Sequence, residues 1–413
     1  MRAASQIQIL AETFDITLGV VSGRIRDTHR DMLIPENIRD LCKSIVAIHR
    51  FSTIALLLKR ARSVQARLIL RALWPTPFSF GRNGPALAAL AEELTGLRFD
   101  VVHCFRLNTA RASRLLKRRR VQFSRSVLDL DAYESEMAFR AVAPITRLSG
   151  RQLGLGQWLD AAKWRLLERV LIPEFDDVFV CSELDRSKLR QRFAKNSWHV
   201  VPNIIPEPSN GIPVRSSRVG VDPFTFLFIG LLSYPPNADG IMFFCTNVLP
   251  LLRQYASSSF RTLIVGREPG ELMRLNELEG VKVIGDAPDI SPFYAQANVA
   301  VVPLRAGGGT RIKILEAFSH CMPVISTSIG AEGLDVTPNT NILIADDPND
   351  FAHQCYRLWM DPWLRHRIAS AGHDLWRTRY NPIALRAALG AVYGTSQAFD
   401  PLRPANSILE GPA

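Results

Sequence analysis

A run of three glycines, Gly307–Gly309, lies between two short apolar runs and constrains the fold more than any other feature of the chain. The run before it, Val299–Val302, is β-branched, as is typical of a strand buried on both faces. Thr310 is a good cap for the helix expected after the glycines, and the second run, Val324–Ser326, follows that helix. This order predicts a strand, a glycine loop, a helix and a second strand, which form a βαβ unit of a parallel sheet.

The residues around the glycine loop are suited to bind a phosphate or diphosphate. Glycines let the backbone approach a ligand closely, and a helix start offers unpaired N–H groups at the positive end of its dipole. Arg305, Arg311 and Lys313 add positive charge at the same place. Glu316 lies away from the apolar face of the helix, where a carboxylate can accept hydrogen bonds from a ribose. The same letters fit a glycine-rich turn beside a Lys–Glu surface pair, and spacing alone leaves both interpretations open.

The sequence GGGTRIKILEAFSHCMPVISTSIGAEGL, which begins at Gly307, resembles the C-terminal signature of glycosyltransferase family 4. It is most similar to the branch whose donor loop reads G-G-x-R-x-K-x-L-E-A and is followed by G-x-P-V. The resemblance covers roughly Phe226–Tyr380 and extends more weakly back to Leu97. Members of this family are retaining enzymes that use nucleotide-sugar donors. The resemblance therefore implies a GT-B fold: two doubly wound, parallel-sheet, Rossmann-like domains facing a cleft.

The resemblance also implies roles for individual residues. Glu316 is expected to bind the donor ribose, and the glycine loop with Thr310 is expected to wrap the diphosphate. Many members carry a second Glu where this chain has Gly308, so the usual contact to the donor sugar is missing. The donor-binding candidates are Gly230, Gly266, Arg267, Gly285, Arg305, Gly307, Gly308, Gly309, Thr310 and Glu316, and the catalytic candidates are Arg311, Lys313 and Asp131. A nucleotide-diphosphate sugar is then the co-substrate, and neither a cofactor nor a metal is expected, since cations can stabilise the leaving diphosphate.

Two candidates on the acceptor side follow predicted strands in the N-terminal part. Asp131 comes directly after the expected strand Ser126–Leu130, where relatives carry acidic residues. His103 lies near the end of the expected strand Phe99–Cys104. It is either a site residue or a hydrogen-bonded structural histidine.

Length and composition indicate a globular protein of two domains. The chain has 413 residues, of which 47% are hydrophobic and 22% charged. We expect an acceptor-side domain over residues 1–205, a donor-binding domain over 206–380 and, over 381–413, a crossing helix and disordered tail. The six cysteines form no CxxC pair, which favours reduced thiols in the cytoplasm. No apolar run approaches the ~20 residues of a membrane-spanning helix.

Positive charge is concentrated in the first 125 residues, which hold 22 Lys and Arg against 9 Asp and Glu. An anionic membrane surface, an anionic acceptor or a nucleic acid could each explain this excess. Aromatic residues are not interleaved with these charges, so nucleic acid is the weakest of the three. Ordinary helices with a solvated basic face would look the same. The membrane hypothesis places the protein on the inner face of the membrane, with contacts from Lys59, Arg60, Arg62, Arg67 and Arg71.

The N-terminus departs from the expected order of a doubly wound domain, which begins with a strand and a glycine loop. Here a helix, Arg2–Thr13, precedes the first expected strand, Ile16–Val20, and the segment Ile34–Arg71 reads as mostly helical. The first strand is therefore expected to be missing, and its two neighbours would face an unpaired slot. Either the true start lies upstream, or the domain is degenerate.

These features favour a glycosyltransferase that acts on a glycan, lipid-linked or other acceptor in cell-surface polysaccharide or glycoconjugate synthesis. The resemblance implies hexosyl transfer with retention. The alternative is a catalytically impaired, donor-binding pseudo-enzyme or a truncated gene product, as Gly308 and the missing strand suggest. A nucleotide-dependent oxidoreductase or epimerase would need G-x-G-x-x-G after its first strand, and the chain has no such text.

Overall fold

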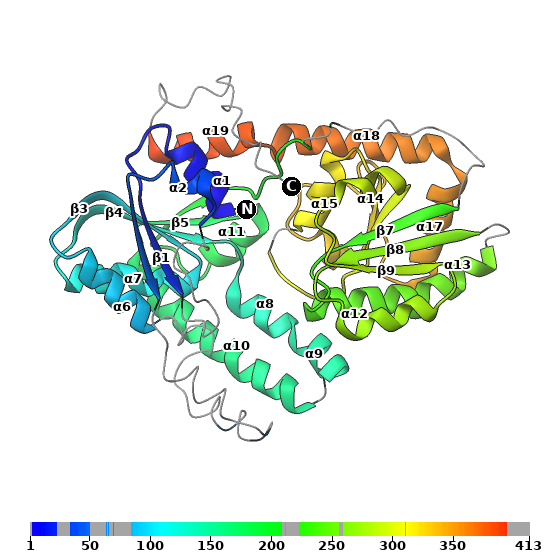
Figure 1. The fold of residues 1–413 in the computed structure, drawn as a ribbon, viewed down its shortest axis with the longest axis horizontal. Helices are drawn as coiled ribbons and strands as arrows, with labels where there is room; N and C mark the ends of the chain where they lie inside the picture. The colour runs from blue at the N-terminus through cyan, green and yellow to red at the C-terminus, as the bar shows by residue number, and fades with distance from the viewer. Residues whose placement is uncertain are drawn as a thin grey trace. The chain divides into compact units, whose positions relative to one another are not determined.

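The computed structural model describes residues 2–22, 34–49, 84–149, 151–208, 223–255, 259–309 and 311–394, together with residues 63, 65, 69 and 211. They divide into two compact α/β units (Figure 1). Of the described residues, one unit contains those up to 202 and those from 385 to 394, and the other contains those from 203 to 384. All five basic residues assigned above to membrane contact lie outside the described residues. No helix in the described part is long and apolar enough to cross a membrane.

The N-terminal unit contains two separate parallel sheets. The larger has the strand order β3-β4-β5-β6, and the smaller pairs β1 with β2. The strands are β1 (Thr17–Ser22), β2 (Ser44–His49), β3 (Arg98–Phe105), β4 (Gln122–Leu130), β5 (Asp177–Val180) and β6 (Ser197–Val200). The helices are α1 (Arg2–Leu10), α2 (Glu36–Arg39), α6 (Gly84–Glu93), α7 (Leu107–Arg118), α8 (Glu134–Arg140), α9 (Val142–Ser149), α10 (Arg151–Leu171), η2 (Ile172–Glu174) and α11 (Glu183–Arg190). The last helix of the chain, α19 (Pro382–Tyr393), enters this unit at Leu385.

The two sheets of this unit are separate in the part of the chain that the structure describes. Among the described residues no strand lies between β1 and β3, so each is an edge strand paired on one side only. One sequence-based prediction here is wrong. Part of Ile34–Arg71, expected to be mostly helical, forms β2, whose Ile45 pairs with Leu18 of β1. A run as short as β2 cannot be assigned to helix or strand by periodicity, and its parallel partner decides the outcome.

The C-terminal unit contains one six-stranded parallel sheet with the order β12-β11-β10-β7-β8-β9. The strands are β7 (Phe224–Ile229), β8 (Phe260–Gly266), β9 (Val281–Gly285), β10 (Val299–Val302), β11 (Val324–Ser326) and β12 (Leu343–Ile344). The helices are α12 (Pro235–Phe243), the π-helical η3 (Phe244–Val248), α13 (Leu249–Tyr255), the 3-10 helix η4 (Gly270–Glu277), α14 (Ser291–Gln296), α15 (Ile312–Ser319), α16 (Ser328–Ala331), α17 (Pro348–Met360) and α18 (Pro362–Arg379). Because the chain leaves β7 toward β8 and returns to β10 on the other side, the strand order reverses between β7 and β10.

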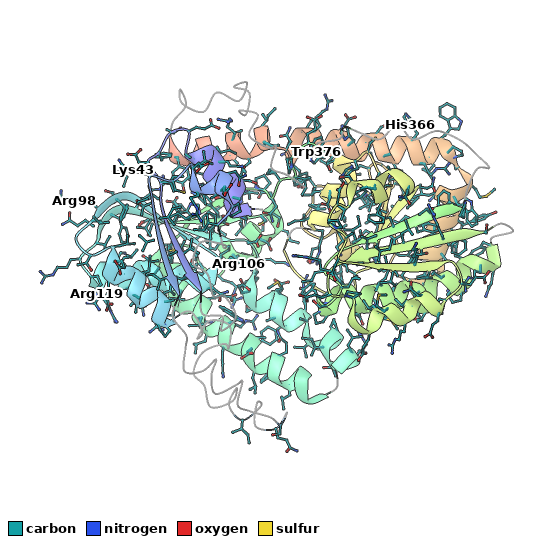
Figure 2. All side chains as sticks on the ribbon, viewed as in Figure 1. Lys43, Arg98, Arg106, Arg119, His366 and Trp376 are labelled. Carbon is teal, nitrogen blue, oxygen red and sulfur yellow. The ribbon has the colours of Figure 1, made fainter. Side chains whose placement is uncertain are left out.

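Helices cover both faces of this sheet, with α12 and α13 on one side and α14 and α15 on the other (Figure 1). The core between them is rich in fully buried aromatic rings, including Phe226, Phe228, Phe244 and Phe318. Trp376 of α18 (Figure 2) donates from Nε1 to the Ile205 carbonyl at 3.0 Å, which fastens the start of this unit to its last long helix. The doubly wound layout expected for this half of the chain is therefore observed.

Candidate functional site

The point where the strand order reverses is the usual place for a ligand in an open α/β sheet. The carboxyl end of β7 leads into Gly230 there, and that of β8 ends at Gly266. The two backbones are in such close contact that a Cβ added to Gly266 would lie 1.8 Å from the Gly230 carbonyl oxygen. Only glycine fits at Gly266, because no flexible group could move aside. Gly285 closes the end of β9 in the same row, packed against Pro269.

Lys313, in the first turn of α15, points to this place. Its amine donates a hydrogen bond to Oδ1 of Asn237 at 2.7 Å and lies 4.3 Å from the centre of the Phe228 ring. A Cβ added to Gly230 would be only 3.1 Å from the amine, so the glycine leaves room for it. Loss of water around the amine, with the nearby charge of Arg311, lowers the pKa of Lys313 to about 7, against an opposing effect of Glu316. The group can therefore gain a proton near neutral pH when an anion arrives.

Glu316 lies one turn further along α15. Its carboxylate accepts a hydrogen bond from the Tyr294 hydroxyl at 3.3 Å. Desolvation raises the pKa of Glu316, while the Tyr294 hydrogen bond and the charge of Lys313 act in the opposite direction. Tyr294 is itself held by stacking on His320, with ring centres 4.2 Å apart. Tyr294 donates to Oε2, so Oε1 of Glu316 can accept a hydrogen bond from a ligand hydroxyl.

Arg311 holds the backbone of the glycine loop, Gly307–Gly309, by hydrogen bonding. Gly307 and Gly309 have φ angles of 120° and 74°, which glycine adopts without strain. The Arg311 guanidinium is buried and donates to the Gly308 carbonyl at 3.0 Å and to the Ile329 carbonyl at 3.0 and 3.2 Å. Helix α15 begins at Ile312 with Arg311 in the N-cap position, and Thr310 lies outside the described residues. In this structure Arg311 supports the loop backbone.

The remaining predicted cations differ in their surroundings. Arg305, after β10, forms a two-pronged ion pair with the buried Asp239 at 2.8 and 3.1 Å, and its guanidinium lies 4.7 Å from the Phe243 ring centre. Arg267, after β8, is exposed. The structure thus brings Gly230, Lys313 and the first turn of α15 together, whereas Arg305 is already paired with a carboxylate.

Asp131, the acceptor-side candidate, belongs to the N-terminal unit and lies after β4. Its carboxylate is 3.5 Å from the guanidinium of Arg106 (Figure 2), which is also 3.7 Å from Glu134. Arg106 has a φ angle of 65°, a strained conformation for a residue with a side chain and typical of functional loops. Burial raises the pKa of Glu134 although Arg106 opposes the effect. Asp131, Arg106 and Glu134 therefore form a charged cluster at the carboxyl end of the sheet.

His103 lies within a buried polar network in the same unit. Its Nδ1 is 3.0 Å from the Tyr393 hydroxyl, and its Nε2 is 3.9 Å from Asp129. The fully buried Asp129 also binds Arg2 at 2.8 Å and Gln6 at 2.7 Å. The hydrogen bond to Tyr393 favours the structural interpretation of His103, one of the two that the sequence leaves open.

Sequence reasoning missed four residues of these clusters: Asn237, Asp239, Tyr294 and Arg106. Asn237 ends the run Tyr234–Asn237, in which the sequence alone gives the asparagine no role. No local sequence pattern predicts Asp239, Tyr294 or Arg106 as site residues, since their partners are distant in the chain. Among the described residues, no group of three or more His, Cys, Asp or Glu is placed to hold a metal ion.

Comparison with known proteins identifies similar chains. Residues 223–361 match the family model described as Glycosyl transferases group 1. A curated relative, an uncharacterized 44.6 kDa protein in the cps region of Klebsiella pneumoniae, is 24% identical over 148 residues. That match covers 34% of this chain and 38% of the relative.

Solved structures resemble the chain over nearly its whole length. A sucrose-phosphate synthase from Thermosynechococcus elongatus has a TM-score of 0.62 at 16% identity, covering 94% of this chain and 91% of its own. Anabaena HepE in complex with UDP has a TM-score of 0.60 at 14% identity, covering 95% of each chain. A glycosyltransferase from Rickettsia africae has a TM-score of 0.58 at 12% identity, covering 92% of this chain and 98% of its own. At such identities these likenesses establish the GT-B fold.

Proposed function

We propose that the protein transfers a sugar from a nucleotide-diphosphate sugar to a glycan or lipid-linked acceptor. The premise is that residues 223–361 match a glycosyl transferases group 1 domain and that the chain has a GT-B fold. The observation that carries the proposal is the position of Lys313 and Glu316. Lys313 projects from the first turn of α15 to the end of β7, where the strand order reverses, and Glu316 lies one turn further along the same helix. A cation and a carboxylate one turn apart match a diphosphate and the ribose attached to it.

Lys313 is the proposed partner of the diphosphate. As the bond between sugar and diphosphate breaks, negative charge accumulates on the leaving group, and fixed cations and backbone N–H groups stabilise it. The amine is already positioned by Asn237, so little reorganisation is needed during the reaction. The glycine loop and the N-terminus of α15 supply further N–H groups close by. Arg311 contributes by holding that loop and by adding positive charge behind it.

Glu316 is the proposed ribose ligand. Its carboxylate is fixed by Tyr294, which is itself fixed by His320. A hydrogen bond between a hydroxyl and a charged carboxylate contributes about 1.5–3 kcal/mol. The nucleotide would then be held at two points, diphosphate and ribose, leaving the sugar at the glycine loop. Gly308 stands where many family members carry a carboxylate that contacts the sugar. The site therefore supports donor binding more strongly than it supports hexosyl transfer with retention.

The acceptor side of the proposal rests on Asp131, Arg106 and Glu134. A carboxylate at the end of a strand can accept a proton from a sugar hydroxyl or hold that hydroxyl in position. The relative from a cps region favours a role in cell-surface polysaccharide synthesis, and HepE in complex with UDP and glucose supports a nucleotide-sugar donor. Basic residues among the first 125 would hold the enzyme at an anionic membrane where a lipid-linked acceptor resides.

A second candidate function is donor binding without transfer. Gly308 in place of a carboxylate supports this second function, as does the absence of a strand between β1 and β3 among the described residues. The two functions share the nucleotide contacts of Lys313 and Glu316. They differ in whether the nucleoside diphosphate is released from the sugar.

The test is turnover of UDP-, GDP-, ADP- and dTDP-sugars with glycan and lipid-linked acceptors, followed by chromatography of released nucleoside diphosphate. We expect release with one donor class, at least tenfold slower in Lys313→Met and unchanged in Lys282→Met, an exposed lysine on β9. Binding of a nucleotide sugar without release would favour the second function. Equal effects of the two lysine variants would contradict the role of Lys313.

A further inference from the structure

The outer face of α10 carries a continuous row of apolar side chains. Six residues share this face and are named the α10 stripe: Leu155, Trp158, Leu159, Ala162, Leu166 and Val170. With 3.6 residues per turn, they lie within about a third of the helix circumference and extend over ~22 Å. Four of them are large side chains between 45% and 59% exposed. Single exposed apolar residues are normal on a protein surface, whereas a contiguous patch marks a place where a partner binds.

The charged residues of α10 are sorted by sign between its two faces. Both acidic residues point inward, since Asp160 and Glu168 are 7% and 2% exposed. On a helical projection Lys163 and Arg165 flank the stripe on its two sides, and Arg169 lies at its end. Along residues 155–171, the solvent-facing side of α10 therefore combines apolar and cationic side chains and has no acidic one.

Helix α7 of the same unit shows the ordinary arrangement. Its exposed side chains are Arg111, Lys117 and Arg118, and its buried ones include Leu107 and Leu116. A surface helix normally turns its apolar residues to the core and its polar residues to water. Packing among the described residues therefore does not explain the α10 stripe.

The inner face of α10 supports the charged cluster of Asp131, Arg106 and Glu134. The carboxylate of Glu168 accepts hydrogen bonds from the backbone N–H of Ser135 at 2.8 Å and from its hydroxyl at 2.6 Å. Ser135 follows Glu134 at the start of α8, and α10 packs against both α8 and α9 (Figure 1). One helix thus carries the stripe outside and holds the start of α8 inside.

We propose that the α10 stripe binds the surface of an anionic membrane, with its apolar side chains inserted between the lipids and Lys163, Arg165 and Arg169 on the lipid phosphates. A helix with leucine and tryptophan on one face, bordered by lysine and arginine, is suited to lie in a membrane interface. A stable protein interface buries ~800 Å² on each partner and needs matching shape. A bilayer accepts a single helix face and supplies negative charge beside its apolar interior. The charge and form of the stripe therefore favour a membrane over a second protein.

This surface deepens the proposed function and, where it concerns the acceptor, rests on it. A lipid-linked acceptor has its lipid in the membrane and its sugar in water, and α10 would bring the cluster around Glu134 to that boundary. The stripe differs from the basic residues invoked above, because apolar contacts persist when salt screens the charges.

The experiment is vesicle flotation of the full chain. Vesicles of phosphatidylcholine alone are compared with vesicles that also contain phosphatidylglycerol, each at low and high salt. The test variant combines Trp158→Ser with Leu166→Ser. The matched control combines Met360→Ser with Trp363→Ser, whose native side chains are 61% and 83% exposed in the other unit. Melting temperatures equal to that of the wild type show that the fold is kept.

We expect the wild type and the control to bind vesicles with phosphatidylglycerol, and the test variant to bind them at least tenfold more weakly. High salt should weaken binding of the wild type and leave a remainder that the test variant lacks. Equal binding by the two variants would overturn the proposal. A wild type that binds neither kind of vesicle would overturn it too, and a lower sedimentation mass of the test variant would then identify an interface between copies.

Fluorescence tests insertion of the stripe directly. Phosphatidylcholine brominated on its acyl chains, added to the anionic vesicles, quenches tryptophans that enter the bilayer. Trp158→Phe keeps an apolar aromatic ring, so this variant should bind like the wild type and lose most of the quenching. Equal quenching of the two proteins would contradict insertion at α10. Titration with UDP, whose proposed contacts belong to the other unit, distinguishes failure of this proposal from failure of the proposed function.

Discussion

The amine of Lys313 donates a hydrogen bond to Oδ1 of Asn237 at 2.7 Å, while the amide nitrogen of Asn237 donates to the Leu231 carbonyl at 2.8 Å. Asn237 therefore links the lysine of α15 to the turn after β7. This hydrogen-bonded pair holds the Lys313 amine beside Gly230 before any ligand binds. Its surroundings also determine how the cation responds to pH.

Nucleoside diphosphate binding should weaken as pH rises from 7 to 9. The pKa of Lys313 is about 7 in the unliganded protein, and a bound diphosphate favours the ammonium form, so its pKa is higher in the complex. Between these two values binding takes up a proton, and affinity falls by up to tenfold per pH unit. Calorimetry in buffers of different ionisation enthalpy measures that uptake.

Lys313→Arg is the matched control, because its guanidinium stays charged throughout this range. It should bind with little pH dependence over the same interval. A wild-type affinity that does not change from pH 7 to pH 9, or an arginine variant that follows the same slope, would rule out Lys313 as the titrating group.

Replacing Glu316 by alanine should weaken nucleoside diphosphate binding by about 1.5–3 kcal/mol, the range for hydrogen bonds to a charged group. The loss should be much smaller for inorganic diphosphate, which has no ribose. Glu277→Ala, an exposed glutamate of η4, serves as the control. Unchanged affinity of Glu316→Ala for every nucleotide tested would refute ribose binding.

Replacing Arg311 by glutamine should destabilise the unliganded protein by about 2–3 kcal/mol, because the partly buried carbonyls of Gly308 and Ile329 lose their charged donor. Faster hydrogen exchange should be confined to the glycine loop and α16. Thermal melting without ligand measures the first effect. If Arg311 served the diphosphate alone, the variant would melt like the wild type and lose only affinity.

Adding a methyl group at Gly266 should cost about 3 kcal/mol of stability, at the upper end for overpacking, because the clash is with the Gly230 carbonyl oxygen. Gly84→Ala is the control, since a Cβ there meets no atom within 4 Å. Chemical denaturation should show a large loss for the first variant and none for the second. Comparable midpoints would mean that the ends of β7 and β8 can separate at no cost.

Much of the C-terminal unit could be predicted from the sequence. The apolar runs at Val299–Val302 and Val324–Ser326 are β10 and β11 with the same bounds. Strands buried on both faces have continuous apolar, mostly β-branched sequences, which makes them easy to recognise. The helix between them followed from the glycine loop.

Other features depended on distant contacts. Arg311 reads as a phosphate ligand in the sequence, yet its guanidinium reaches the Ile329 carbonyl, which no local pattern reveals. The pairing of Arg305 with Asp239 joins residues far apart in the chain. β2 was mistaken for helix because its partner β1 lies across a long connection. Ion pairs and strand partners of this kind are set by the fold.

The central claim is that α15 presents a nucleotide-diphosphate site. Its most direct test is isothermal titration of the protein with UDP, GDP, ADP and dTDP at pH 7, repeated with Lys313→Met and Glu316→Ala combined. The account predicts saturable one-to-one binding of at least one diphosphate by the wild type, reduced at least a hundredfold in the double variant. No binding of any of the four, or equal binding by the double variant, would contradict it.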